Sequence, residues 1–143
     1  MVEIGGLILL PSLILGIVLG LWEYIFIHAD ENFRGSHALG HALHIMPFII
    51  IATFISMNID FFLSLVGGSL PGFLTNVYIL RGALVLVVAI KIHAGSAVVA
   101  GAKGKGMHES WYHTLIIALA VAVAPYAWMF LGPIAPSWMG GGN

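Results

Sequence analysis

The stretch from Phe26 to Phe48 reads FIHADENFRGSHALGHALHIMPF, and it joins the first long apolar run of the chain to the second. Its middle, Asp30 to Gly35, is a short polar turn, and Ser36 is a suitable N-cap for a helix that follows. Four of the seven histidines lie in this stretch, at His28, His37, His41 and His44. The last three follow i, i+4, i+7 spacing, which places them within about 60° on one helix face. We therefore expect two helices joined by a polar turn and a row of imidazoles at the junction.

The amino-acid composition is typical of an integral membrane protein. Of its 143 residues, 60% are hydrophobic and only 8% are charged, and the mean hydropathy is +1.05. A soluble domain averages about a quarter charged residues, so this balance predicts an integral membrane protein surrounded by lipid. A net charge of -1 gives no basis for binding nucleic acid, and the absence of cysteine excludes disulfides and thiolate metal sites. We expect one transmembrane helical domain covering residues 1–143.

The expected fold is all-α, an integral membrane bundle of four transmembrane helices. The predicted spans are Ile4–His28, Ser36–Met57, Asn76–Ala100 and Glu109–Leu131. Residues Phe61–Thr75 either extend the second span or form a short interfacial or re-entrant segment between spans two and three.

The prolines, the glycines and the C-terminal tail give further predictions. The prolines Pro11, Pro47 and Pro125 are expected inside the spans, which membrane helices tolerate. The glycines of Leu15–Gly20 and of the run that begins at Gly82 are expected at helix contacts. The tail from Gly132 onward is expected to be unfolded, with Trp138 as a possible interfacial anchor.

Four spans alternate in direction, which would gather all seven histidines at one membrane face. The basic residues Arg34, Lys103 and Lys105 fall on that side, against Arg81 near the other. The positive-inside rule then makes the histidine side cytoplasmic and places both termini outside, in a cell or inner membrane.

A transition-metal site is the first functional prediction. Ionisable side chains inside a membrane usually mark function, and one His or Glu from each helix of a bundle at a common level forms a natural metal cage. His28, His37 and His108 lie at or outside the interface, where histidine is unremarkable, although His37 and His41 at i, i+4 can together chelate one ion. The predicted ligands are His37, His41, His44, His93, His113, Glu23 and Glu109. Imidazole with carboxylate suits Cu(II), Zn or Fe alike.

A haem alternative and the role of Lys91 stand beside the metal prediction. His44 and His93 could instead be the two axial ligands of a haem b. Lys91, close to His93 in the third span, is expected either to extend toward the headgroups or to pair with a carboxylate, Glu23 or one of another chain.

The spacings His37-x3-His41-x2-His44 and His108-x4-His113 resemble the histidine boxes of membrane fatty-acid desaturases and hydroxylases. The resemblance covers about a tenth of the chain, and the HxxHH box of that family is absent. The resemblance implies a metal held by imidazoles, and we do not carry the di-iron oxygenase activity over.

Three functions are compatible with these patterns. The first is a small integral membrane subunit of a larger membrane metalloenzyme, of the oxidase or copper-type monooxygenase class, with other membrane subunits as partners. The second is a stand-alone homo-oligomer, built from copies of this chain, that binds or transports a metal ion or proton. The third, weaker alternative is a bis-His haem b electron carrier. Whether the chain itself catalyses a reaction is open at this point.

Overall fold

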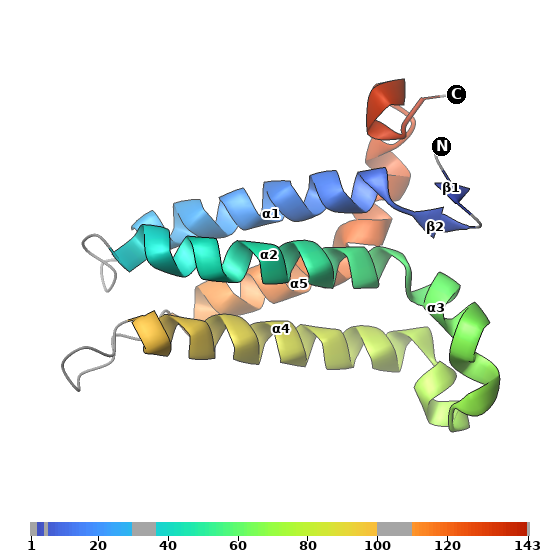
Figure 1. The fold of residues 1–143 in the computed structure, drawn as a ribbon, viewed down its shortest axis with the longest axis horizontal. Helices are drawn as coiled ribbons and strands as arrows, with labels where there is room; N and C mark the ends of the chain where they lie inside the picture. Colours follow the sequence, from blue (N-terminus) through green and yellow to red (C-terminus); the bar gives the residue numbers. More distant parts are fainter. Residues whose placement is uncertain (1–2, 5, 30–36, 100–109, 143) are drawn as a thin grey trace.

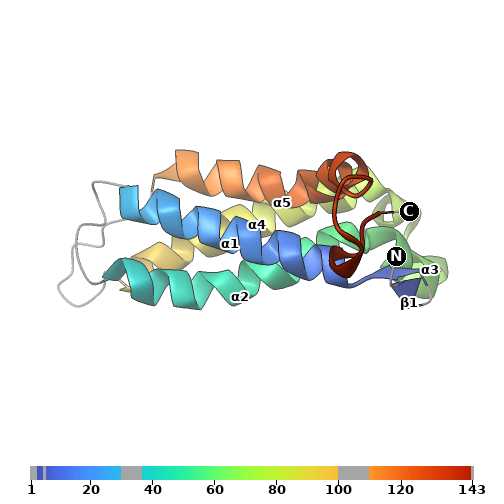
Figure 2. The ribbon, with the colours of Figure 1, turned by 90° about the horizontal axis from the view of Figure 1, so that it is seen from above.

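Four long helices lie side by side as an antiparallel bundle (Figures 1 and 2). They are α1 (Leu10–Ala29), α2 (His37–Met57), α4 (Val77–Val99) and α5 (Trp111–Leu131). This computed structural model describes residues 3–4, 6–29, 37–99 and 110–142, without the side chains of residues 3–4, 29, 37–39, 41–42 and 96–99. The predicted all-α bundle is confirmed.

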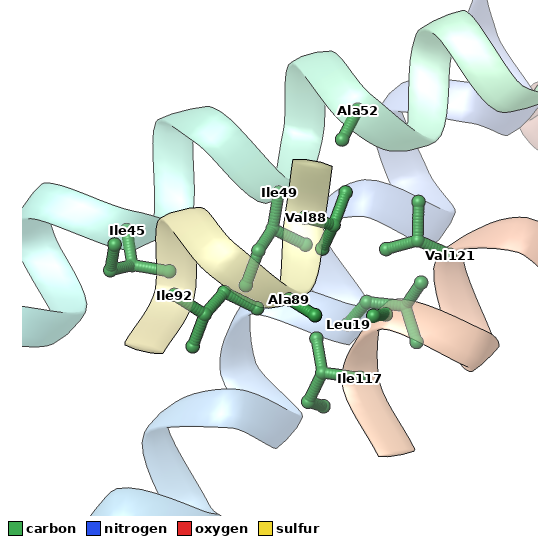
Figure 3. Close-up of a cluster of buried hydrophobic side chains, with 10 residues drawn as sticks. Leu19, Ile45, Ile49, Ala52, Val88, Ala89, Ile92, Ile117 and Val121 are labelled. Atoms are coloured by element: carbon green, nitrogen blue, oxygen red, sulfur yellow. The ribbon is translucent and has the colours of Figure 1, made fainter. Parts of the chain in front are cut away.

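The helices surround one apolar core. Helix α1 packs on α2, α2 on α4, α4 on α5 and α5 on α1, and α2 also touches α5 across the bundle. The side chains between them point toward one another and are almost entirely aliphatic (Figure 3). The buried cluster comprises Leu19, Ile45, Ile49, Ala52, Val88, Ala89, Ile92, Ile117, Ala118 and Val121.

Helix α1 begins later than predicted. Residues Glu3–Ile4 (β1) and Leu7–Ile8 (β2) form a short antiparallel hairpin, in which Gly6 has a φ of +87°. Glycine accepts this left-handed backbone without a steric penalty. The predicted start of the span at Ile4 is therefore wrong. Pro11 lies in the first turn of α1, where a missing N–H costs no helical hydrogen bond.

The segment after α2 is a separate, bent unit. Helix α3 (Ile59–Val66) leaves α2 at Asn58 with a bend of 67°, and the 3₁₀ turns η2 (Gly67–Ser69) and η3 (Gly72–Thr75) lead into α4. Phe61–Thr75 does not continue α2 as a straight helix, and the bend is compatible with a broken span two and with a re-entrant segment.

Asn58 ties this bend to the N-terminal hairpin. Its amide is buried, its Oδ1 accepts from the Ile8 N–H at 2.6 Å, and its Nδ2 donates to the Ile8 carbonyl at 3.0 Å and the Phe54 carbonyl at 2.8 Å. One side chain thus satisfies backbone groups of both segments.

The C-terminal tail is folded, which contradicts the prediction. The 3₁₀ turn η4 (Ser137–Met139) contacts α1, and Met139 packs against the second apolar cluster of Met57, Ala124 and Trp128. Gly140, at a φ of +82°, lies so close to Pro11 that a Cβ there would be 3.1 Å from the proline ring. The small residues at the end of the tail allow this approach, which composition alone did not indicate.

The described helices are suited to a bilayer. Three are long and apolar enough to cross it, over Leu10–His28, Val77–Gly95 and Trp111–Leu131, and the bent pair Leu43–Met57 with Ile59–Ser69 passes the same test. Large apolar side chains cover their outer faces. These include Ile17, Val18, Leu21, Ile25, Leu86, Val87, Ile90, Leu115, Leu119, Val123 and Phe130.

Candidate functional site

The histidine-bearing ends of the four helices converge at one end of the bundle. The C-terminal ends of α1 and α4 and the N-terminal ends of α2 and α5 all lie there (Figure 1). We call this the histidine end. Among the described side chains, His28, His44, His93 and His113 belong to it, as the alternating topology predicts.

Glu23 is the most unusual residue at this end. Its side chain is 1% exposed and belongs to the face of α1 that also buries Leu19 and Ile27. The spacing of these residues, i−4 and i+4 from Glu23, is that of a core-facing helix stripe. A carboxylate therefore occupies a position that the pattern of α1 otherwise gives to aliphatic side chains. Burial of a carboxylate in a membrane span is costly, so Glu23 is a candidate functional residue.

His113 and His93 each lie half-buried against an aromatic ring. The His113 imidazole of α5 stacks on Phe26 of α1, with ring centroids 5.2 Å apart and planes inclined by 12°. The His93 imidazole of α4 stacks on Trp111 of α5 at 4.0 Å and 21°. Helix α5 starts just outside these contacts, where the Ser110 side chain accepts a hydrogen bond from the Tyr112 N–H at 3.3 Å.

These contacts set the relative depths of the three groups. Glu23 lies one helical turn, about 4.5 Å, deeper than Phe26, and hence deeper than the His113 ring that stacks on Phe26. Trp111 precedes His113 by about 3 Å along α5, which places the His93 ring nearer the end of the bundle. The carboxylate and the two imidazoles therefore span about 8 Å along the bundle axis.

The other predicted ligands are less enclosed or lie outside the described side chains. His44, like His28, is exposed on the outside of the bundle, so the proposed haem pair combines an exposed His44 with a half-buried His93. The side chains of His37 and His41, and the whole of Glu109, lie outside the described part of the chain. Within that part, no group of three or more His, Asp or Glu side chains is arranged to hold a metal ion. The metal site remains a prediction, since three of its seven ligands lie outside the description.

Lys91 is exposed on the outer surface of α4, whereas Glu23 is buried in the core. The exposure of Lys91 favours the alternatives in which it reaches the headgroups or a carboxylate of another chain. The lysine extends away from the bundle, toward lipid headgroups or a neighbouring chain.

Sequence reasoning treated Arg81 only as a charge for topology, and the structure places it in a second polar site at the opposite end. Its Nη1 donates to the Ser56 carbonyl and the Ser56 Oγ, both at 3.3 Å, and to the Ala122 carbonyl at 3.1 Å. Its Cζ lies 5.1 Å from the centre of the Tyr126 ring. A cavity of about 710 Å³ opens beside it. A lone arginine inside an apolar span was the signal that could have identified this site.

No protein-family model, curated protein or solved structure matches this chain. The two polar ends of the bundle differ in their chemistry. The histidine end has a buried carboxylate and stacked imidazoles, and the opposite end has a half-buried guanidinium beside a cavity.

Proposed function

We propose that this protein is a small integral membrane subunit of a larger membrane metalloenzyme complex, and that its histidine end holds a transition-metal ion. The observation that carries the proposal is the burial of the Glu23 carboxylate in a bundle whose main core cluster is aliphatic, at the same end as His93 and His113. A membrane bundle gains no stability from a buried carboxylate that an aliphatic residue would not provide. A cation bound at the histidine end would be stabilised by this carboxylate.

The available donors indicate the class of metal. Imidazole nitrogen and carboxylate oxygen suit Cu(II), Zn or Fe, and cysteine is absent from the chain. Glu23 could serve either as a ligand or as the acceptor that orients a ligating imidazole. Since the described side chains form no group of three ligands, a closed site requires a further ligand from the predicted residues outside the description, His37, His41 or Glu109, or from a neighbouring subunit.

The outer surface supports a role within a complex. Lys91 is exposed on α4 about 12 Å from the end of that helix at Val99, which is deep for a charge that faces lipid. His44 is likewise exposed on α2. Partner subunits that cover these faces would give both side chains polar neighbours, and the surrounding apolar side chains would provide the packing surface.

The core favours a static site over a transport path through one copy of the chain. Between the histidine end and Arg81, the bundle is filled by buried aliphatic side chains, including Leu19, Ile49, Val88 and Val121 (Figure 3). An ion or proton path needs ionisable groups across this layer, whereas buried polar side chains described there, such as Thr53 and Thr114, are hydroxyls that donate to backbone carbonyls one turn earlier.

Metal analysis tests the proposal. The protein, purified with its native membrane partners in mild detergent, should contain a transition metal by elemental analysis. Glu23→Gln, His93→Gln and His113→Gln should each lower the metal content several-fold. The matched control is His28→Gln, which changes an exposed histidine at the same end of the bundle. Metal retention should also fall as the pH drops through about 6.5, where free histidine protonates.

The contradicting outcomes are distinct. Equal metal content in the wild type and all four variants would reject the metal assignment. A Soret band in the visible spectrum would replace it with the haem alternative. A metal-loaded, active protein that purifies as a stable single chain would contradict the subunit assignment.

A further inference from the structure

We propose that the cavity beside Arg81 binds a membrane phospholipid, with the phosphate diester of the headgroup paired to the Arg81 guanidinium. This site lies at the end of the bundle opposite the histidines and requires no metal. The charge of Arg81, the shape and lining of the cavity, and the depth of the cavity in the bilayer support the proposal.

The guanidinium of Arg81 lacks an anionic partner among the described residues. Its three acceptors are the neutral oxygens of Ser56 and Ala122, and its buried Nε has no hydrogen-bond acceptor there. The Tyr126 ring adds a cation–π contact but no negative charge. Neutral acceptors and an aromatic ring offset only part of the free-energy cost of removing this half-buried positive charge from water. A phosphate, like a carboxylate, matches a planar guanidinium through two parallel N–H···O bonds.

The cavity has the size and lining for a lipid headgroup with the start of its chains. Its volume is about 710 Å³. Most of the lining is apolar or aromatic, from Met57, Val77, Pro125, Trp128 and Met129 among others. Arg81 and Asp60 are its two charged lining residues, of opposite sign. A neighbouring groove of about 470 Å³ between α3 and α4 is lined by apolar side chains such as Phe62 and Leu84, and it could accept an acyl chain.

Aromatic side chains place the cavity at headgroup depth. Along α5, Trp111 and Tyr112 lie near the start of the helix, and Tyr126 and Trp128 lie near its end. The separation of 14 to 17 residues corresponds to about 21 to 26 Å, somewhat less than the roughly 30 Å of the hydrocarbon layer. Trp and Tyr concentrate at the two membrane interfaces. Tyr126 and Trp128 line the cavity, so it opens where lipid phosphates lie.

The charge of Asp60 indicates which class of phospholipid headgroup the cavity would bind. This exposed carboxylate would repel a headgroup with additional negative charge and attract a primary ammonium. The pair of Arg81 and Asp60 therefore matches a zwitterionic headgroup, with a phosphate beside one residue and an ammonium beside the other. Phosphatidylethanolamine has this arrangement.

Lipid titration of the purified full-length protein, followed by native mass spectrometry, tests the inference. The probes are phosphatidylethanolamine, phosphatidylglycerol, inorganic phosphate, and a diacylglycerol with the same chains but no phosphate. The wild type should bind phosphatidylethanolamine at least about tenfold more tightly than diacylglycerol, because one charged hydrogen-bonded pair contributes that much. Equal binding of the two would overturn the proposal without any mutation.

Variants locate the site. Arg81→Gln should abolish the preference for phosphatidylethanolamine over diacylglycerol, and Asp60→Asn should shift the preference toward phosphatidylglycerol. Lys91→Gln is the matched control, since it removes an exposed cation from the same helix outside the cavity. A helical Arg81→Gln variant that keeps the wild-type preference would refute the role of Arg81. Binding of inorganic phosphate as tight as that of the lipid would identify a simple anion site and refute the lipid assignment.

Discussion

Replacement of Gly16 by alanine should separate α1 from α2. An ideal Cβ at Gly16 would lie 2.8 Å from the Ile50 Cα and 3.3 Å from both the Cβ and the carbonyl oxygen of that residue. The nearest atom is backbone, so it cannot move aside without displacing the whole of α2. The sequence predicted this glycine at a helix contact, and the structure confirms it.

Whether Gly16→Ala raises or lowers the free energy of unfolding depends on two opposing contributions, helix propensity and overpacking. Alanine is favoured over glycine in a helix interior by about 0.8–1 kcal/mol. Overpacking at a rigid contact typically costs about 1–3 kcal/mol, and a 2.8 Å approach to backbone belongs at the upper end. We expect Gly16→Ala to lower the free energy of unfolding by about 1–2 kcal/mol.

Two other glycines in the long helices serve as controls. At Gly20 the added Cβ would meet the Met46 Cγ at 2.8 Å, and a flexible side chain can rotate away at a cost of about 1 kcal/mol. Gly20→Ala should therefore be close to neutral. A Cβ at Gly82 meets nothing within 4 Å, so the prediction of a helix contact there is wrong within the chain. Gly82→Ala should be neutral or stabilising by up to about 1 kcal/mol.

Reversible unfolding by sodium dodecyl sulfate in mixed micelles, followed by far-ultraviolet circular dichroism, measures all three variants. The expected order of stability is Gly82→Ala, then Gly20→Ala, then Gly16→Ala. If Gly16→Ala were as stable as Gly82→Ala, the close approach of α1 and α2 at Ile50 would be refuted.

The same unfolding assay checks two further substitutions. Asn58→Leu should destabilise the protein by about 1–3 kcal/mol, because the Ile8 N–H loses the amide oxygen and the Ile8 carbonyl keeps only the Ser12 hydroxyl as a side-chain donor. An unchanged midpoint would mean that the hairpin does not depend on this amide. Ile117→Ala removes a fully buried core side chain and should cost about 2 kcal/mol or more through lost packing. The control Leu119→Ala, on the same helix but 53% exposed, should change stability little, and equal losses in the two variants would contradict the assigned orientation of α5.

The sequence identified one polar end and missed the other. A cluster of closely spaced histidines is visible in the primary structure, and the alternation of four spans was sufficient to bring the described ones to the same end. Arg81 has no other charged residue close to it in sequence, and its neighbours Ser56 and Ala122 come from two other helices. No spacing along the chain could have indicated that cavity, because its lining is assembled from segments that are distant in sequence.

Composition and apolar run length determined the fold class. In a bilayer, unpaired backbone groups are so costly that a run of about 20 apolar residues has little alternative to a helix, and the spans therefore followed from the sequence. Apolar side chains are nearly equivalent to lipid, so hydrophobicity does not specify which helix face turns inward.

Tertiary packing decided the remaining features. The close contact at Gly16 selected the approach of α1 to α2, and the hydrogen bonds of Asn58 positioned the bend between α2 and α3. Gly140 and Met139 anchored a tail that composition predicted to be unfolded. The burial of Glu23 in the core likewise depends on how α1 is rotated against its neighbours. Each of these features depends on contacts between residues far apart in the chain, and such contacts exist only once the helices have met.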